Sequence, residues 1–374
     1  MLKIGVTGQS GFIGKHLFNS LGLFPLEFER VHFKKEYFLN ANKLNEFVAQ
    51  CDIIVHLASI NRDPNPQFIY DTNIELTKKL VNALDFTKSK AYVLFSSTIH
   101  EENNNIYGES KKVCREILYS WSQKSGGFFL GLIIPNVFGP FCKPNYNSVI
   151  ATFCHNLTQN KKTSIDVDIV LNLIYIDELI RIIISSIRKV RINQEFRIEP
   201  TKKIKVSEAL TILKKFKIEY EEMGIIPSFS NSFELNLFNT YRSYIDLKKY
   251  YPVLFQQHID NRGSFVEITR SGVGGQFSFS KTFPGIVRGN HYHIRKVERF
   301  SLIKGKALIQ LRRVGEKEIF NFYLDGDKPS YIDIPIWYTH NIKNIGEDVL
   351  FTNFWVNEFY DPNDSDTYFE NVLI

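Results

Sequence analysis

The first fourteen residues of the chain constrain its fold most strongly. A short apolar run, LKIGVT, leads directly into three glycines spaced three residues apart, Gly8, Gly11 and Gly14. Such a turn needs residues without side chains, so that the backbone can approach a pyrophosphate at the N-terminus of the following helix. Placed between a strand and a helix, the pattern predicts a dinucleotide-binding turn. We expect Phe12 and Ile13, inside the same turn, to contact the cofactor as well.

The stretch from here to about residue 245 alternates apolar runs with helical patterns. The apolar runs include DIIVHLA, AYVLFSS and FFLGLII, and the segments between them repeat their apolar residues at helical spacing. Short continuous apolar strands separated by helices predict a parallel sheet that is buried on both faces. Right-handed crossovers then give a doubly wound α/β domain of the Rossmann type. We expect this domain to span residues 1–245, with a substrate lobe at about residues 141–245.

A tyrosine and a lysine four residues apart form a second motif. Tyr107 and Lys111 share one face of a predicted helix, and we expect the ammonium to lower the pKa of the phenol. The tyrosine would then donate a proton to a carbonyl near neutral pH. The preceding strand ends with Ser97 and Thr98, whose hydroxyls could hold the same carbonyl oxygen. This combination favours a catalytic pair over a tyrosine that packs on a solvated helix.

Taken in order, these motifs resemble the extended short-chain dehydrogenase/reductase family. The matching segments are TGQSGFIG, VHLA, FSST, YGESK and PNVFGP. The resemblance implies that Thr98, Tyr107 and Lys111 are catalytic, with Ser97 as the alternative to Thr98. It also implies cofactor contacts from two further motifs, namely from Leu57, Ala58, Pro135, Asn136 and Phe138.

The chain departs from this family where the ribose of the cofactor would bind. After the second predicted strand, where the family carries an acidic residue, the chain has His32, Lys34 and Lys35. Basic side chains suit a 2′-phosphate, so we expect NADP(H), used as NADPH, with Lys34 among its ligands. Glu29 or Glu36 would keep NAD as an alternative.

After about residue 250 the pattern changes to short alternating strands separated by turns. Examples are GQFSFSKTF, KGKALIQLRR, EKEIFNFYLDGD and SYIDIPI. Many closely spaced strands with Gly and Asp-Gly breaks predict an antiparallel barrel or sandwich. We expect this all-β domain to span residues 246–374.

Three histidines and a glutamate in this region have the spacing of a metal site. His291 and His293 lie two residues apart and would face the same side of a strand. Glu298 enters the next strand, and His340 follows downstream. Three imidazoles and a carboxylate suit Zn, Fe, Mn or Ni, and the ligand set alone does not choose between them. Four candidate ligands together outweigh the usual interpretation of a single histidine as a satisfied polar residue.

The same residues resemble the cupin signature. Its first motif matches over residues 285–305 and its second over residues 335–344, with Trp337 where the family often has glycine. The resemblance implies a divalent metal, for which we expect zinc. Its ligands would be His291, His293, Glu298 and His340.

An extended reductase followed by a metal cupin resembles, over essentially the whole chain, the CapF/WbjC-type bifunctional UDP-sugar reductase/epimerases of bacterial capsule and O-antigen synthesis. The resemblance implies a UDP-linked 4-keto-6-deoxy amino sugar as substrate, UDP-2-acetamido-2,6-dideoxy-β-L-arabino-hexos-4-ulose. The cupin would epimerise C3, next to the acidifying C4 ketone, and the reductase would use NADPH to give UDP-N-acetyl-L-pneumosamine, a precursor of UDP-N-acetyl-L-fucosamine. Tyr338, two residues before His340, is either the C3 base or part of the barrel core, and Glu267 and Lys304 are weaker candidates for the base.

Two other functions stay open at this point. The chain could be a UDP-4-ketosugar reductase whose cupin only dimerises and stabilises it, or a non-enzymatic NADP-responsive binding protein. A net charge of +6 over 374 residues, without any run of five like charges, argues against a nucleic-acid partner. The most apolar stretch, around residues 179–187, is too short to span a bilayer. We therefore expect a protein that neither inserts into membranes nor binds nucleic acid. We also expect it to be cytoplasmic and to form a homodimer.

Overall fold

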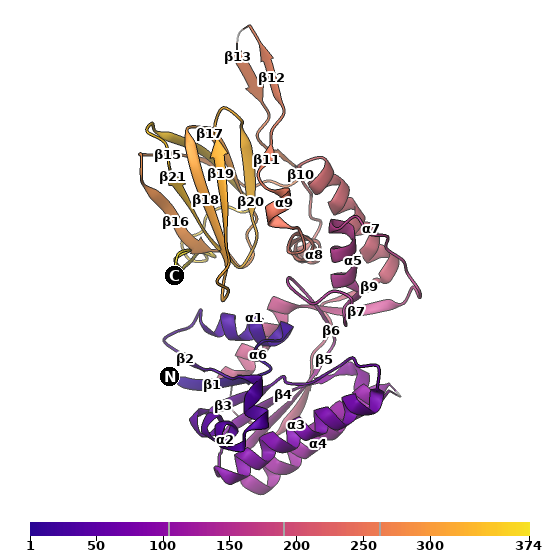
Figure 1. Cartoon of the computed structure of the whole chain (residues 1–374). Helices are drawn as coiled ribbons and strands as arrows, with labels where there is room; N and C mark the ends of the chain where they lie inside the picture. The colour runs from indigo at the N-terminus through magenta and orange to yellow at the C-terminus, as the bar shows by residue number, and fades with distance from the viewer. Residues whose placement is uncertain (104, 190, 262) are drawn as a thin grey trace. The chain divides into compact units, whose positions relative to one another are not determined.

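The computed structural model of the chain describes residues 1–103, 105–189, 191–261 and 263–374. It divides into two compact units that alternate along the sequence, and each is formed by two segments (Figure 1). The first unit contains Met1–Thr152 and Asp166–Val206, and the second contains Phe153–Ile165 and Ser207–Ile374. The functional division of the chain at residue 245 stays a prediction.

The first unit is built around a parallel sheet of six strands. Their order is β2-β1-β3-β4-β5-β8, and every neighbouring pair is parallel. The order reverses at β1, so the carboxyl ends of β1 and β3 form the topological switch point where ligands bind in such sheets. The strands are β1 (Leu2–Thr7), β2 (Phe28–Val31), β3 (Ile53–His56), β4 (Tyr92–Thr98), β5 (Phe128–Ile134) and β8 (Gln194–Arg197).

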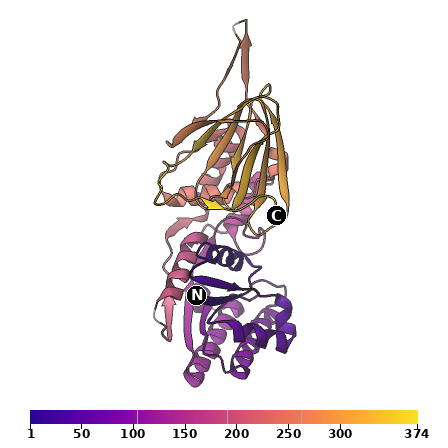
Figure 2. The same cartoon turned by 90° about the vertical axis from the view of Figure 1, so that its left-hand side faces the viewer.

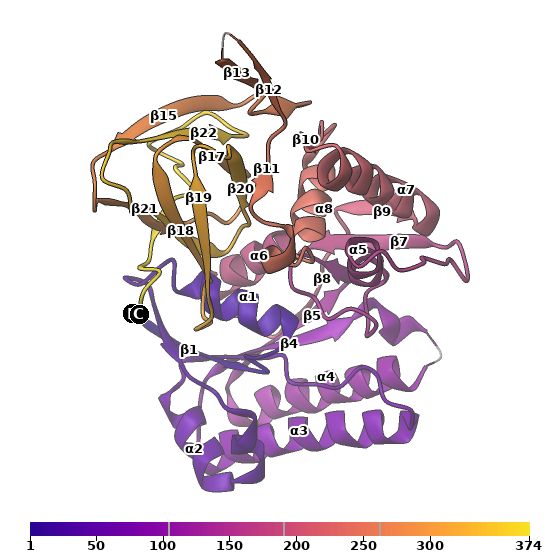
Figure 3. The ribbon, with the colours of Figure 1, turned by 45° about the horizontal axis from the view of Figure 1, so that its top comes forward.

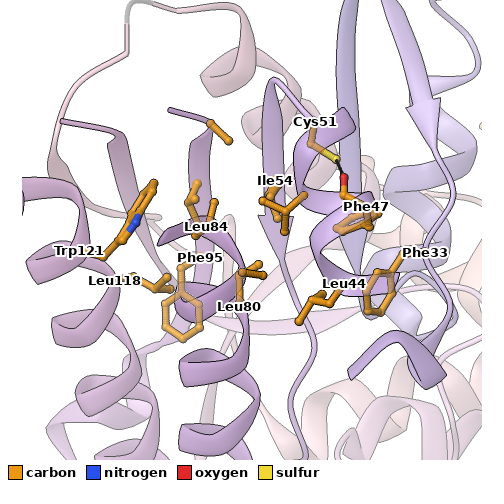
Figure 4. Close-up of a cluster of buried hydrophobic side chains, with 14 of the residues drawn as sticks. Phe33, Leu44, Phe47, Cys51, Ile54, Leu80, Leu84, Phe95, Leu118 and Trp121 are labelled. Carbon is orange, nitrogen blue, oxygen red and sulfur yellow. Dashed lines mark hydrogen bonds between the residues drawn. The ribbon is translucent and has the colours of Figure 1, made fainter. Parts of the chain in front are cut away.

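Helices cover both faces of this sheet, which confirms the doubly wound prediction (Figures 1 and 3). One face carries α2 (Ala41–Gln50), α3 (Pro66–Phe86) and α4 (Ile106–Ser125), and the other carries α1 (Phe12–Leu21) and α6 (Ile176–Arg188). In the core beneath the first set, side chains from three helices meet Ile54 of β3 and Phe95 of β4 (Figure 4). The helical side chains labelled there are Leu44, Phe47, Leu80, Leu84, Leu118 and Trp121.

Shorter elements complete the first unit. It also contains a separate three-stranded sheet in the order β6-β7-β9. One 3-10 turn follows β2 and another follows β4. Helix α5 (Val149–Thr158) crosses from the first unit into the second. The remaining bounds are η1 (Lys35–Leu39), η2 (Ile99–Glu102), β6 (Asn136–Phe138), β7 (Val170–Tyr175) and β9 (Lys202–Lys205).

The second unit contains two antiparallel sheets of five strands each, which confirms the all-β prediction for the C-terminal region. Their orders are β11-β20-β17-β22-β15 and β19-β18-β21-β16-β23. The strands are β11 (Val253–Leu254), β15 (Gln276–Thr282), β16 (Val287–Tyr292), β17 (Glu298–Lys304), β18 (Lys306–Arg313), β19 (Ile319–Asp325), β20 (Ser330–Ile334), β21 (Tyr338–Asn344), β22 (Leu350–Val356) and β23 (Tyr368–Phe369). Their core includes Phe300, Leu302, Ile309, Leu311, Ile332 and Ile342.

Helices and a hairpin accompany these sheets within the second unit. The hairpin of β12 (Gln257–Asp260) and β13 (Gly263–Val266) extends away from the sheets (Figure 2). A short parallel pair joins β10 (Ile225–Ile226) to β14 (Arg270–Ser271). The helical elements are α7 (Val206–Phe216), the π-helical turn η3 (Lys217–Glu222), α8 (Ser232–Arg242) and α9 (Leu247–Tyr250). In the described parts of the chain, no helix combines the length and apolar character needed to cross a membrane.

Candidate active site and metal centre

The glycine turn predicted from the sequence lies at the switch point of the parallel sheet. Gly8 has a φ of +73°, and a Cβ there would lie 2.8 Å from the backbone nitrogen of Ala58. A Cβ at Gly14 would approach the carbonyl oxygen of Gly8 to 2.2 Å. The N–H of Gly11 donates to that same oxygen at 2.9 Å. A side chain at Gly8 would therefore force the turn away from the chain at Leu57 and Ala58, and one at Gly14 would force α1 away from the turn itself.

A buried histidine braces the ends of β1 and β3. The Nδ1 of His56 lies 2.7 Å from the hydroxyl of Thr7, and its Nε2 lies 3.4 Å from that of Thr77. Its ring stacks on Phe95, with 5.7 Å between the ring centroids. Burial lowers the pKa of His56 to about 3, and the ammonium of Lys111 acts in the same direction. The ring is therefore neutral at physiological pH and supports the strand ends beside the glycine turn.

Thr98 lies where the predicted chemistry needs it, at the carboxyl end of β4. It pairs in register with Ile134 at the end of β5, so Pro135 and Asn136 begin immediately beside it. The Oγ1 of Thr98 accepts a hydrogen bond from the N–H of His100 at 3.2 Å. This bond starts the turn η2 and fixes the side chain of Thr98 at the edge of the sheet.

The aromatic residues of two predicted cofactor motifs pack inside the protein. Phe138 is 1% exposed, and its ring centroid lies 5.3 Å from that of Tyr175. Phe12 packs its ring edge-on against His16, whose Nε2 lies 3.0 Å from the carbonyl oxygen of Pro140. These contacts join the first turn of α1, which also contains the half-buried Ile13, to the segment after β6. The two motifs are therefore held together by packing across the switch point.

The predicted tyrosine–lysine pair occupies the first turns of α4. Asn105 caps this helix by accepting a hydrogen bond from the N–H of Gly108 at 2.8 Å. Lys111 is 2% exposed, and its Nζ lies 4.3 Å from the ring centroid of Phe95. Burial lowers the pKa of Lys111 to about 8.

The predicted direction of the pKa shift at Tyr107 is wrong for this structure. Burial raises the pKa of the Tyr107 phenol to about 12, and nearby Tyr146 adds to the effect. Desolvation of the phenolate is the largest cause of this shift. The phenol is protonated at neutral pH, which is the state that a proton donor requires.

An ion-pair network that the sequence did not predict lies behind the end of β4. The carboxylate of Glu101 accepts a hydrogen bond from the hydroxyl of Ser97 and binds Arg115, whose Nη2 lies 2.8 Å from Oε2 and whose Nε lies 3.0 Å from Oε1. Arg115 also pairs with Glu195. Because Glu101 already holds Ser97, the network favours Thr98 as the hydroxyl that would face a substrate. Fourteen residues separate Glu101 from Arg115, and no sequence pattern indicated the pair.

The basic residues predicted to select the cofactor follow β2. The N–H of Phe33 donates to the Oε1 of Gln9 in the glycine turn at 3.0 Å, so the two segments are adjacent. Lys34 and Lys35 are exposed, and the ring of His32 packs on α1. The ammonium groups of Lys34 and Lys35 are thus available to a ligand held by the glycine turn. The choice between NADP and NAD stays a prediction.

The four predicted metal ligands converge within the second unit. One ligand atom each from His291, His293, Glu298 and His340 lies within 4.8 Å of all the others. The Oε2 of Glu298 lies 3.3 Å from the Nε2 atoms of both His293 and His340. In the described chain, these three atoms are buried and have no hydrogen-bond partner. Unpartnered buried polar atoms are costly, so a cation bound between them fits this donor set.

Two members of the cluster, Glu298 and His291, have pKa shifts that favour the ionisation states of metal ligands. Burial opposes ionisation of Glu298, but the imidazoles of His293 and His340 hold the pKa of its carboxyl well below the usual range. Burial, together with the neighbouring imidazoles, lowers the pKa of His291 to about 3. A carboxylate and a neutral imidazole at neutral pH are both able to bind a metal.

Tyr338 opens β21, two residues before the candidate ligand His340. Its ring centroid lies 6.2 Å from that of Phe320, and its carbonyl oxygen lies 3.2 Å from the Nδ1 of His340. Burial raises the pKa of its phenol, while Arg313 acts in the opposite direction. The ring thus has core contacts, and its predicted role as a base stays a prediction.

Comparison with known proteins identifies the family. Residues 4–198, just over half of the chain, match the sequence model of the NAD dependent epimerase/dehydratase family. The chain belongs to this family. Residues 258–368 match a second model, the polysaccharide biosynthesis C-terminal domain.

Two relatives match this chain over nearly its whole length, and so over both regions. The chain is 32% identical to the UDP-2-acetamido-2,6-beta-L-arabino-hexul-4-ose reductase of Pseudomonas aeruginosa, over 98% of each chain. It is 33% identical to the capsular polysaccharide assembling protein CapF of Staphylococcus aureus, and the crystal structure of CapF superposes with a TM-score of 0.62 over 99% of this chain and 100% of that one. The likeness to CapF-type proteins is thereby confirmed.

A third relative matches a smaller part of the chain. The spore coat polysaccharide biosynthesis protein SpsL of Bacillus subtilis is 28% identical over 122 residues, which are 29% of this chain and 80% of SpsL.

Proposed function

We propose that this protein reduces the C4 ketone of a UDP-linked 4-keto-6-deoxy amino sugar with NADPH, as a step in bacterial polysaccharide synthesis. The whole-length likeness to the reductase of Pseudomonas aeruginosa supports the substrate class. The observation that carries the proposal is that Thr98 ends β4 while Lys111, one turn after Tyr107 in α4, has its Nζ 4.3 Å from the ring centroid of Phe95 in the same strand. A binding protein without catalysis would not need this set.

The residues of the first unit have separate tasks in this reduction. Bound NADPH would supply the hydride to C4. Tyr107, protonated at neutral pH because burial raises its pKa to about 12, would give its proton to the ketone oxygen. The hydroxyl of Thr98 would hold the same oxygen. Lys111 would place a positive charge behind the phenol and stabilise the phenolate that remains.

The fit of the turn to a dinucleotide supports the choice of cofactor class. Because Gly8 and Gly14 have no side chains, the backbone packs closely in the turn that starts α1, and the N-terminus of such a helix binds a pyrophosphate well. Lys34 and Lys35, exposed after β2, would favour the 2′-phosphate of NADPH.

We further propose that the second unit epimerises C3 of the same substrate before reduction. A divalent metal, for which zinc is expected, would be held by the four-ligand cluster and would stabilise the enolate that forms next to the C4 ketone. The three unpartnered buried atoms of the cluster support this role. Tyr338 is the candidate base, and the final product would be UDP-N-acetyl-L-pneumosamine.

A homodimer is part of the same proposal. Large apolar side chains on and after the edge strand β15 are exposed to solvent, including Phe277, Phe279 and Phe283 at 57%, 69% and 69%. Exposed apolar patches of this kind are typical of protein interfaces. Sedimentation of the wild type and of a Phe279→Ser variant would test it, and a monomeric wild type would contradict it.

NMR of the 4-ketosugar in D₂O tests the two activities separately. The sugar is incubated with the protein first without NADPH and then with it. We expect deuterium to enter C3 without NADPH in the wild type and in Tyr107→Phe, but not in His293→Ala. We expect reduction with NADPH in the wild type but not in Tyr107→Phe. Reduction without any exchange at C3 would restrict the second unit to a structural role, and exchange without reduction would refute the reductase.

A further inference from the structure

The last residues of the chain run beside the candidate metal ligands. Residues 357–374, which we call the C-terminal strap, include β23, and β23 pairs with β16 so that Phe369 lies opposite the ligand His291. The N–H of Glu370 donates to the carbonyl oxygen of Asn290 at 3.0 Å. At its start, the side-chain oxygen of Asn357 accepts from the N–H of Val297 at 2.8 Å. The strap is thus attached on both sides of the segment that carries three of the four ligands.

Asp366, in the middle of the strap, contacts the ligand His293 through its backbone. The carbonyl oxygen of Asp366 lies 2.5 Å from the Nδ1 of His293. A carbonyl oxygen can only accept a hydrogen bond, so Nδ1 carries a proton, and in the neutral ring that binds a metal Nε2 keeps its lone pair. That Nε2 is the atom that faces Glu298 at 3.3 Å. The contact therefore fixes both the tautomer and the orientation that a metal ligand needs.

The carboxylate of Asp366 holds the loop between two ligands. Its oxygens accept the backbone N–H groups of Ile294, Arg295 and Lys296 at 3.1, 3.1 and 3.0 Å. These three residues join His293 to Glu298, and three bonds to one carboxylate restrict how far the two ligands can separate. Asp366 is 3% exposed, so these bonds form away from competing water.

The backbone of Asp366 is itself held in an uncommon conformation. Its φ is +45°, in the left-handed region that residues with a side chain rarely adopt. The neighbouring Tyr368 stacks on Tyr292, with 5.4 Å between ring centroids, and Tyr292 stacks on Trp337 at 5.6 Å. Trp337 also has a left-handed backbone, and its N–H donates to the carbonyl oxygen of His293 at 2.7 Å. Strained positions persist when their surroundings over-determine them, and here both adjoin His293.

The end of the strap is anchored by a buried arginine. Arg312 of β18 is 3% exposed, and its guanidinium donates to the carbonyl oxygens of Val372 and Asn371 at 2.8 and 2.7 Å. It also pairs with the carboxylate of Glu370 at 2.7 Å. This anchor keeps β23 on β16. Asp366 is therefore held near His293 by attachments on both sides of it in the chain, at Asn357 and at the Arg312 anchor.

From this geometry we propose that Asp366 is a positioning residue of the metal centre, which orients His293 through its carbonyl and sets the His293–Glu298 separation through its carboxylate. The inference rests on the metal site of the proposed function. It adds a residue 73 positions from His293 that no cupin motif contains. Asp366 does not point a ligand atom into the cluster, and its effect on the metal is therefore indirect.

Metal binding by purified full-length variants tests this role without any activity assay. The test compares Asp366→Ala and Asp366→Asn with Asp364→Asn, a control in the same strap whose carboxylate is 69% exposed and pairs with Arg295. Zn²⁺ affinity is measured by competition with a chromophoric chelator, and the visible spectrum of the Co²⁺ form reports ligand geometry. We expect Asp366→Ala to bind Zn²⁺ about 10 to 100 times more weakly and to change the Co²⁺ spectrum.

The conservative variant keeps the test decisive if Asp366→Ala folds poorly. Asn tolerates left-handed backbone and retains one side-chain acceptor, so Asp366→Asn should fold and lie between the wild type and Asp366→Ala in affinity. Asp364→Asn should match the wild type. A folded Asp366→Asn or Asp366→Ala protein with wild-type Zn²⁺ affinity and an unchanged Co²⁺ spectrum would overturn the proposal while leaving the metal site intact. A wild type that binds neither ion would refute the metal site itself, and Asp366 with it.

Discussion

Gly108 packs so closely against His100 that a Cβ at Gly108 would approach the carbonyl oxygen of His100 to 1.9 Å. His100 belongs to η2, the turn that starts from the side chain of Thr98, and Gly108 directly follows Tyr107. The contact therefore sets the distance between the two proposed catalytic hydroxyls. It links the end of β4, through η2, to the start of α4.

Replacing Gly108 by alanine should impair catalysis more than binding. The added methyl group must push the first turn of α4 away from η2, and a misplacement of about 1 Å can lower a rate by about 100-fold. We expect kcat for ketosugar reduction to fall by about that factor while NADPH affinity stays unchanged. The control is Gly126→Ala at the other end of α4, where φ is +71°. It should cost about 1 kcal/mol of stability and leave kcat unchanged. Equal kcat values in both variants would contradict the coupling.

The adjacent hydroxyls of Ser97 and Thr98 should differ sharply in function. Thr98→Val keeps the shape of the side chain but removes the hydroxyl that would hold the ketone oxygen. We expect kcat to fall by about 100-fold or more, as when one oxyanion donor is removed. Ser97→Ala removes a hydrogen bond to Glu101 and should cost about 1 kcal/mol of stability with a much smaller effect on kcat. Steady-state kinetics and urea unfolding of the two variants would measure this, and the opposite ranking of kcat values would assign the role to Ser97.

The exposed lysines after β2 should determine cofactor preference. A double variant, Lys34→Ala with Lys35→Ala, removes the charges that would meet a 2′-phosphate. We expect KM for NADPH to rise by about 10-fold or more, because hydrogen bonds to charged groups contribute about 1.5 to 3 kcal/mol. KM for NADH should not change. Lys43→Ala on α2, also exposed and paired with Glu46, serves as the control. If both cofactors respond equally, the lysines act only as general surface charge.

Local patterns were sufficient to predict the parallel sheet, the glycine turn and the convergence of the four metal-ligand candidates. Each depends on short-range spacing. The turn depends on the spacing of Gly8 to Gly14, and the metal cluster depends on two short motifs, at residues 291–298 and at His340, that the fold brings together. The Glu101–Arg115 pair and the contact of Asp366 with His293 could not be predicted, because they join segments whose register is set by tertiary packing. The pKa of Tyr107 was predicted with the wrong sign because spacing reveals a neighbouring charge but not the degree of burial.

Acidification should destabilise the first unit through His56. Its pKa is about 3 in the folded protein and about 6.5 in an unfolded chain, so the unfolded state binds more protons between these values. The stability that the neutral ring contributes is complete above pH 6.5 and is lost as the pH falls toward 3. The slope for this one group is at most about 1.4 kcal/mol per pH unit. Hydrogen exchange of the β1 and β3 amides between pH 4.5 and 7 should show this loss in the wild type and a shallower dependence in His56→Gln, since glutamine keeps polar contacts with Thr7 but does not titrate. Identical pH profiles for both proteins would mean that other groups, and not His56, cause the acid sensitivity.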